Sequence, residues 1–263
     1  MDIQILQLVE GARQAKGLTV IIDVFRAFTT ESFIMSRNPE KIIPVGDVEV
    51  AWDYKANHPD TVLCGERGGA IIEGFDYGNS PSAVIEDDFT GKTVIHTTSA
   101  GTQGIVNAVD ADEILGGCLV NAKAVACYIK QKQPEFVSLV CMGLAGKRPT
   151  DEDTLCAEYI KSLLEDRPLA DMDKRVRALQ YTDGAKFFDA SQQHIFPRRD
   201  FELSTMVGIC PFVLRLTPDA ESGLHRMERV DIPESFTTPD NAKFTDFTRE
   251  QQLFLPAWFR KNI

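Results

Sequence analysis

The chain has 263 residues, 43% of them hydrophobic and 25% charged, a composition that excludes disordered and collagen-like chains. Its 28 Lys and Arg against 39 Asp and Glu give a net charge of −11, so a polyanion such as nucleic acid is not an expected partner. The N-terminus lacks the segments of a signal peptide, and no apolar run approaches the roughly 20 residues of a membrane span. We therefore expect a cytoplasmic protein that does not bind membranes.

The hydrophobic pattern alternates between short β-branched runs and amphipathic stretches. The order of these stretches predicts an α/β fold, layered α/β/α, with a mixed, largely parallel sheet. Strands are expected at 18–22, 42–45, 61–64, 93–96, 113–115 and 136–142, and helices at 27–37, 47–57, 101–109, 119–132 and 151–165.

The last third of the chain has a different pattern. The pattern of residues 173–207 predicts a mainly helical region with a possible break at Gly184. Residues 211–216 and 224–230 are predicted to form a β-hairpin late in the chain. These features predict a main domain over 1–232, with a possible subdomain division near 110–135. The aromatic-rich segment 233–263 is expected to pack on this domain or on another subunit, and we expect a homo-oligomer.

The six cysteines are sparse and contain no C-x-x-C pair. In a chain of this length they predict reduced thiols, mostly buried as small hydrophobic side chains.

The first unusual segment, 23–30 (DVFRAFTT), follows the predicted buried strand 18–22. Loops that leave the carboxyl ends of strands are where α/β sheets bind ligands. Asp23 could ligate a hard cation through oxygen, and Arg26 could hold an anion in a bidentate manner. The alternative is that Asp23 caps the next helix and Arg26 pairs with it.

Two further segments carry groups that bind anions. Segment 65–81 contains GERGG and GFDYGNSP, whose glycines let backbone amides converge on an anion, although turns alone also require glycine. Segment 96–102 (HTTSAGT) runs into a helix start, whose free amides favour negative charge. Capping of the helix explains one of the four hydroxyls in this segment, so four are more than a cap needs. His96 is the histidine that we consider a candidate, because it lies next to these hydroxyls.

The fourth segment, 140–148 (VCMGLAGKR), places Cys141 at the end of a strand before a loop of small residues. The acidic residues 151–153 start the next helix, where they either bind a cation or favour the helix dipole.

Several phosphate chemistries are excluded by inspection. Glu86 stands where a P-loop needs its leading glycine, Lys147 stands where a Cys-x5-Arg phosphatase needs arginine, and Phe25 stands where an Asp-x-Asp phosphatase needs its second acid.

Taken together in this order, the four segments resemble one family, the 2-phosphosulfolactate phosphatases, which are magnesium-dependent enzymes of coenzyme M biosynthesis and their bacterial relatives. DVFRAFTT resembles the family's D-x-x-R-A-T-T-T, and GERG with GFDYGNSP resembles its G-E-R-G and G-F-D-x-G-N-S-P. TTSAGT is similar to its T-T-x-N-G-T turn, and Cys141-Met142-Gly143 with Glu152-Asp153 to its C-x-G loop and acidic helix start. The resemblance covers roughly residues 18–165.

The resemblance implies a phosphoric monoester hydrolase that uses Mg²⁺ to act on a small anionic phosphorylated substrate, with 2-phosphosulfolactate the first expectation. It implies metal-binding or water-orienting roles for three acids, anion-clamping roles for two arginines, and substrate contacts for a set of hydroxyl, amide and backbone donors. The acids are Asp23, Glu66 and Asp153, the arginines are Arg26 and Arg67, and the donors are Thr29, Thr30, Asn79, Ser80, Thr97, Thr98, Gly101 and Thr102. Cys141 is expected to line the site or pack, with a nucleophilic role as the less favoured alternative.

The chain also departs from the family pattern. Phe28 and Ala100 replace a hydroxyl and an asparagine, and residues 200–204 (DFELS) stand where the family has a shorter acidic segment. Two alternatives therefore stay open beside the phosphatase: a non-catalytic anion-binding module of the same fold, and a phosphatase for another small phosphorylated acid. An unrelated α/β domain whose motifs are only caps and turns is a third.

Overall fold

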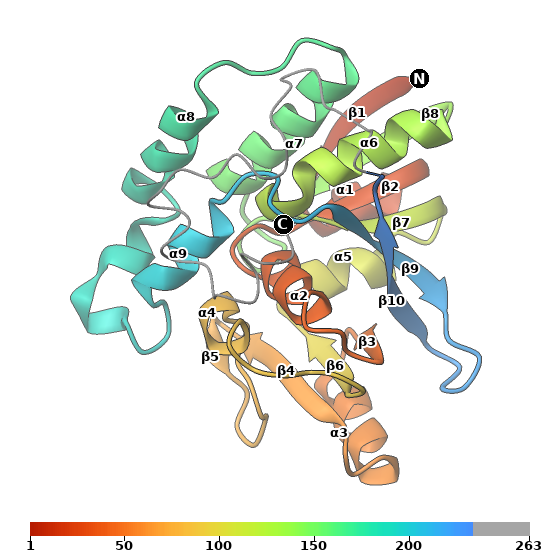
Figure 1. Ribbon diagram of the computed structural model, residues 1–263, viewed down its shortest axis with the longest axis vertical. Helices are drawn as coiled ribbons and strands as arrows, with labels where there is room; N and C mark the ends of the chain where they lie inside the picture. Colours follow the sequence, from red (N-terminus) through yellow and green to blue (C-terminus); the bar gives the residue numbers. More distant parts are fainter. Residues whose placement is uncertain (234–263) are drawn as a thin grey trace.

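The computed structural model describes residues 1–233, in which ten strands form one mixed sheet (Figure 1). The strand order is β1-β8-β2-β7-β9-β10-β3-β6-β4-β5. The strands are β1 (Asp2–Gln7), β2 (Gly17–Ile22), β3 (Lys41–Pro44), β4 (Val62–Arg67), β5 (Ala70–Ile71), β6 (Thr93–Thr97), β7 (Ala111–Gly117), β8 (Phe136–Cys141), β9 (Phe212–Pro218) and β10 (His225–Asp231).

The helices connect these strands, and most of them are short. The α-helices are α1 (Leu8–Gln14), α2 (Ala27–Met35), α3 (Val48–Asn57), α4 (Pro81–Val84), α5 (Gly101–Asn107), α6 (Ala122–Lys132), α7 (Asp151–Leu164), α8 (Met172–Ala178) and α9 (Arg198–Ser204). The 3₁₀ turns are η1 (Leu119–Asn121), η2 (Leu179–Tyr181), η3 (Ala185–Phe188) and η4 (Ala190–Gln192).

The sheet contains two sets of parallel strands. The first strand set is β1, β8, β2 and β7, and the second strand set is β3, β6 and β4. The β9–β10 hairpin joins them through antiparallel pairs on each side, β9 with β7 and β10 with β3. Because three successive pairings are antiparallel, the two sets run in opposite directions.

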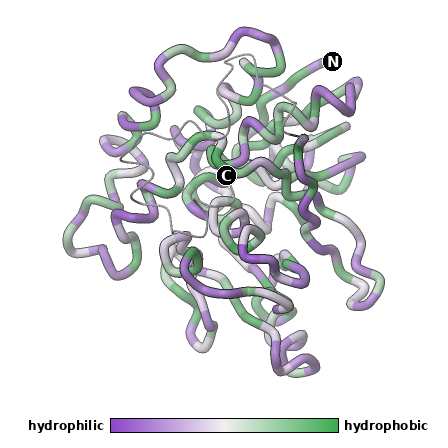
Figure 2. Tube along the Cα trace, in the orientation of Figure 1, coloured by the Kyte–Doolittle hydropathy of each residue, from purple (hydrophilic) through white to green (hydrophobic). Residues whose placement is uncertain are grey.

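Apolar side chains of the strands build the core. Strands β2, β8, β3 and β6 are buried on both faces along most of their length, as expected for parallel strands covered by helices. In Figure 2 the inner strands carry much of the hydrophobic colour, whereas the β9–β10 hairpin and the outer helices and loops carry much of the polar colour. Helices α6 and α7 pack beside one another, as do α1 and α5.

Helix α5 comes especially close to the first strand set. A Cβ at Gly104 would lie 2.4 Å from Ile21 Cγ2 and 2.6 Å from the Met142 sulfur, so this position of the helix requires glycine. Since α5 directly follows β6, this contact packs the helix after the second strand set against the first strand set.

The predicted α/β class with a mixed, largely parallel sheet is confirmed. The predicted strands and the late hairpin are present, and Gly184 separates two 3₁₀ turns where a break was expected. All six cysteines are free and buried, as predicted. The expectation of a mainly helical segment at 173–207 is only partly confirmed, because 3₁₀ turns and loops interrupt it.

Four elements were not expected from the sequence. They are β1, α1, β5 and α4, each of seven residues or fewer. Strand β1 lies at the edge of the sheet and is only partly buried, so it lacks the continuous apolar run that marks the inner strands.

The predicted subdomain division near 110–135 falls on β7 and α6, and the sheet is continuous across β7. The aromatic segment 233–263 lies almost wholly outside the described residues. None of the helices in residues 1–233 is long and apolar enough to span a lipid bilayer.

Candidate active site

The carboxyl ends of the two strand sets meet in the interior of the molecule. Asp23 directly follows β2 of the first set, and its Oδ2 accepts a hydrogen bond of 2.9 Å from the amide of Gly101, which follows β6 of the second set. The segments singled out from the sequence leave these strand ends, so the fold brings them together.

Asp23 is buried, with a relative exposure of 6%. Its Oδ1 accepts a hydrogen bond from the Ala27 amide at the start of α2. Burial and the nearby Glu66 carboxylate raise the pKa of Asp23 to about 6, although the two backbone amides favour its charged form. Gly101 is needed here, since a Cβ would lie 2.8 Å from Ala27 Cβ and 3.1 Å from Asp23 Oδ2.

A second buried carboxylate, Asp153, stands at the start of α7. Its Oδ1 accepts a hydrogen bond from the Val24 amide and its Oδ2 one from the Gly143 amide, both 2.8 Å. Asp153 thereby ties the loop after β2 to the loop after β8. Burial and the charges of Glu152 and Asp23 raise its pKa well above the usual range.

Glu152 precedes Asp153 and is also buried. Its Oε2 has no hydrogen-bond partner among residues 1–233. Burial raises the pKa of Glu152 to about 7, and the nearby Lys186 ammonium opposes the rise. The site therefore contains several buried carboxylates that repel one another.

Glu66, at the end of β4, joins two loops of the second strand set. Its Oε1 accepts a hydrogen bond from the Ser99 amide, and its Oε2 accepts one from the Gly69 amide, both 2.6 Å. A Cβ at Gly69 would lie 2.4 Å from the Phe196 ring, so close approach explains this glycine.

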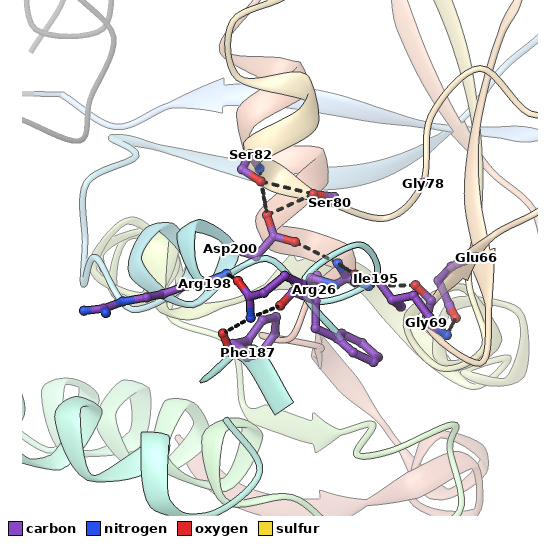
Figure 3. A network of polar contacts seen from close by, with 12 residues as sticks. Arg26, Glu66, Gly69, Gly78, Ser80, Ser82, Phe187, Ile195, Arg198 and Asp200 are labelled. Carbon is purple, nitrogen blue, oxygen red and sulfur yellow. Dashed lines mark hydrogen bonds and ion pairs between the residues drawn. The ribbon is translucent and has the colours of Figure 1, made fainter. Parts of the chain in front are cut away.

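Arg26 is buried in a polar network that Figure 3 shows at close range. Its NH1 donates to Asp200 Oδ2 at 2.7 Å and to the Ile195 carbonyl at 2.8 Å, and its NH2 donates to the Gly69 carbonyl at 2.9 Å. The other oxygen of Asp200 accepts hydrogen bonds from Ser80 and from the amide and hydroxyl of Ser82.

This network bears on two predicted site residues. The alternative that Arg26 pairs with Asp23 is not what the structure shows, because its carboxylate partner is Asp200 on α9. The Ser80 hydroxyl is likewise directed at Asp200. Both residues hold the loops around the site in place, and their predicted contacts with substrate stay predictions.

Arg67 is exposed, and it fixes the ends of β4 and β6 together. Its guanidinium donates to the Glu66 carbonyl at 2.7 Å and to the Thr97 hydroxyl at 3.0 Å. Thr98 and Thr102 bond reciprocally, since the hydroxyl of each accepts a hydrogen bond from the other's amide. The Ser99 hydroxyl donates to Glu66 Oε2 at 3.2 Å, so all four hydroxyls in segment 96–102 have structural partners.

The remaining predicted residues are buried. The Thr29 hydroxyl donates to the Val24 carbonyl, whereas Thr30 Oγ1 and Asn79 Oδ1 have no partner within the described part of the chain. The Cys141 thiol donates to the Asp153 carbonyl at 3.4 Å. Burial, together with the Asp153 carboxylate, raises the pKa of Cys141, which disfavours a nucleophilic thiolate.

No three His, Cys, Asp or Glu side chains in residues 1–233 are grouped closely enough to form a metal site on their own. Mg²⁺, however, is commonly held by one or two carboxylates together with water and substrate phosphate. An unpartnered Glu152 oxygen and the raised pKa values of the buried Asp23, Glu152 and Asp153 fit a cation bound in this way. Asp23 and Asp153 retain lone pairs for it beyond those that accept amides.

Residues 3–198 match the family described as 2-phosphosulpholactate phosphatase. The chain belongs to this family. It is therefore a phosphatase, a phosphoric monoester hydrolase. The resemblance drawn from the four sequence segments is confirmed.

Curated relatives support the assignment. A probable 2-phosphosulfolactate phosphatase of Bacillus subtilis is 30% identical over 235 residues, which cover 88% of this chain and all of that protein. Proteins with the same description are 39% identical in Caldanaerobacter subterraneus and 40% identical in Caldicellulosiruptor saccharolyticus. These two matches cover 56% and 55% of this chain and 62% and 61% of the respective relatives, so they span less than two thirds of the relatives' length.

The structure brings three further residues to the candidate site, none of which had an individual role among the predicted site residues. Glu152 had a signal, because it lies within the acidic start of α7. Asp200 lay in a segment noted only as a departure from the family pattern. Lys186, on η3, had no local signal, and only the fold places it near Asp23 and Glu152.

Proposed function

We propose that this chain is a Mg²⁺-dependent phosphatase that hydrolyses a small phosphorylated hydroxy acid, most specifically 2-phosphosulfolactate, to the free acid and phosphate. The observation that carries the proposal is the group of buried acids Asp23, Glu152 and Asp153 where the two strand sets meet. The substrate is taken from the descriptions of the relatives and from the family.

The acids of the proposed site divide into those that bind the metal and one that accepts a proton. Asp23 and Asp153 would hold the metal, with Glu66 as the third acid implied by the sequence. When bound, Mg²⁺ neutralises the phosphoryl charge and stabilises the leaving alkoxide. Glu152, whose pKa is about 7 and whose Oε2 is unpartnered in the described residues, accepts the proton of the attacking water.

Hydrogen bonds from the loop backbone fix the positions of these acids. Asp153 fixes the loops after β2 and β8, and Glu66 fixes the loops after β4 and β6. Because their backbone donors are already placed in the folded protein, the acids need little rearrangement when substrate binds.

The test measures phosphate release from 2-phosphosulfolactate, phospholactate and phosphoglycolate, with Mg²⁺ and with a chelator. We expect the chelator to abolish turnover and Asp23→Asn to lower kcat by about 10²–10⁴-fold, the range for loss of an acid–base or metal-binding group. Asp88→Asn is the matched control, because Asp88 is exposed and bonds only to Thr90 among the described residues.

Two results would contradict the proposal. Turnover per folded molecule that survives Asp23→Asn would remove the catalytic role of this acid. The phosphorylated acids could also raise the melting temperature of the wild type without any release of phosphate. This result would favour the alternative, a non-catalytic anion-binding module of the same fold.

A further inference from the structure

Lys186 lies among three aromatic rings. Its Nζ lies 5.2 Å from the ring centroid of Phe196, 5.4 Å from that of Phe187 and 5.9 Å from that of Phe25. The rings pack on one another, with centroid distances of 5.1 Å for Phe25–Phe187 and 5.8 Å for Phe187–Phe196. Cation–π contacts on several rings restrict a flexible lysine side chain to one region.

The charges around Lys186 are those of the active site. Its ammonium is under the electrostatic influence of Glu152, Asp23 and Asp183, which favour the charged form, and of Arg26, which opposes it. Among residues 1–233, no carboxylate oxygen lies within 4.0 Å of the Lys186 Nζ, the distance that defines an ion pair. Its donors are therefore not committed to any described acid.

Three arginines near the site are already engaged. Arg26 is bonded to Asp200 and to two carbonyls, and Arg148 is paired with Asp183. Arg67 donates to the Glu66 carbonyl and the Thr97 hydroxyl. Lys186 thus differs from these arginines, because its ammonium is under the electrostatic influence of Glu152 and Asp23 while its donors are uncommitted among the described residues.

The segment from η3 to α9, which contains Lys186, is anchored to the loop after β2. Phe187 and Ile195 lie beside Arg26 in Figure 3, and Arg26 in turn bonds to the Ile195 carbonyl and to Asp200. This anchoring gives the buried Arg26–Asp200 pair a positioning role.

We propose that Lys186 binds the phosphoryl group of the substrate and places it against Asp23 and Glu152. The inference rests on the proposed function and adds a binding residue that the family motifs do not include. A phosphate monoester dianion brings negative charge next to buried acids, and a compact ammonium with three donors offsets that charge. The apolar rings around it strengthen the attraction by excluding water.

The experiment compares two competitive inhibitors of the Mg²⁺-loaded enzyme, inorganic phosphate and sulfolactate. We expect Lys186→Met to weaken inhibition by phosphate about 10- to 100-fold, the loss typical of a charge-assisted hydrogen bond, and to leave inhibition by sulfolactate within about 2-fold. Lys186→Arg should restore part of the phosphate affinity. Lys174→Met is the control, because Lys174 is exposed and paired with Asp171 on the surface.

A purely structural role gives a different pattern. Equal weakening of both inhibitors, or a large loss of melting temperature in Lys186→Met that Lys186→Arg does not repair, would overturn the inference. Unchanged phosphate inhibition in a stably folded Lys186→Met would overturn it as well.

Calorimetric titration of the wild type and Lys186→Met with inorganic phosphate separates this inference from the proposed function. If the wild type binds phosphate through Lys186 but hydrolyses none of the substrates, only the proposed activity fails. If the wild type hydrolyses a substrate and Lys186→Met binds phosphate equally well, only the inference fails. A wild type that binds no phosphate contradicts the inference.

Discussion

At the scale of single residues, the pair of His96 and Glu31 shows how a partner offsets the cost of burying an ionisable group. His96 and Glu31 are both fully buried, and His96 Nδ1 lies 2.7 Å from Glu31 Oε1. Burial alone disfavours the imidazolium, yet Cys64 and Glu31 raise the pKa of His96 to about 10. His96 directly precedes Thr97 and Thr98, so this pair supports the end of β6 on which the site depends.

A pH dependence of stability follows from the His96 pair. Because the pKa is about 10 in the folded state and about 6.5 in the unfolded state, the pair gives its full stabilisation below about pH 6.5 and loses it as the pH rises through about 10. Urea unfolding of wild type and His96→Gln should show a difference in free energy that is largest at pH 6 and shrinks toward pH 10.

The control for this measurement is His194→Gln, because His194 is exposed. A difference between wild type and His96→Gln that stays constant from pH 6 to pH 10 would contradict a charged His96 in the folded state.

At the scale of elements, helix α9 is joined to the site by one buried carboxylate. Asp200 and Arg26 are 0% and 3% exposed, and Asp200 also accepts hydrogen bonds from Ser80 and Ser82. The short helix α9 contributes Phe201 and Leu203 to the core, and Asp200 supplies its buried ion pair, whereas its pair between Arg199 and Glu86 lies at the surface.

Removing the charge of Asp200 should therefore be costly. Asp200→Asn leaves Arg26 buried without an anionic partner, and we expect a loss of about 3–5 kcal/mol in the free energy of unfolding. Asp171→Asn, which breaks the exposed pair with Lys174, should change it by less than about 0.5 kcal/mol. Chemical denaturation measures both, and equal effects of the two variants would argue against a stabilising buried pair.

At the scale of the whole molecule, the β9–β10 hairpin unites two sets of strands that run in opposite directions. Strand β9 pairs with β7 through Leu115 and Gly116, and β10 pairs with β3 through Met227. Helix α5 adds a second connection, since Gly104 packs on Ile21. The site lies between the two sets, so its geometry depends on their staying joined.

This arrangement predicts that the two strand sets unfold together. Leu214→Ala, at a fully buried position of β9 opposite Gly116, should lower stability by about 2–5 kcal/mol. Hydrogen exchange should show that the amides of β2 and β6 lose protection to the same extent. The control Val109→Ala alters an exposed side chain, and continued protection of β6 alone would contradict a single cooperative unit.

Much of the local structure was predictable because the inner strands are continuous apolar runs and the loops carry glycine, hydroxyl and acidic residues at fixed spacings. The same pattern singles out Asp23, Glu66 and Gly101, and the fold brings Glu66 and Gly101 close to Asp23. The edge strand β1 and the two-residue β5 were missed, since partly buried or very short strands leave weak patterns.

By itself, the sequence determined the α/β class, the order of most elements and the family, because each rests on local hydrophobic periodicity or on ordered motifs. Only the tertiary structure decided that Arg26 pairs with Asp200, that Glu152 joins the buried acids and that Lys186 comes under their electrostatic influence. These contacts link residues up to 174 positions apart, and no local pattern encodes which distant side chains become neighbours when two opposed strand sets meet.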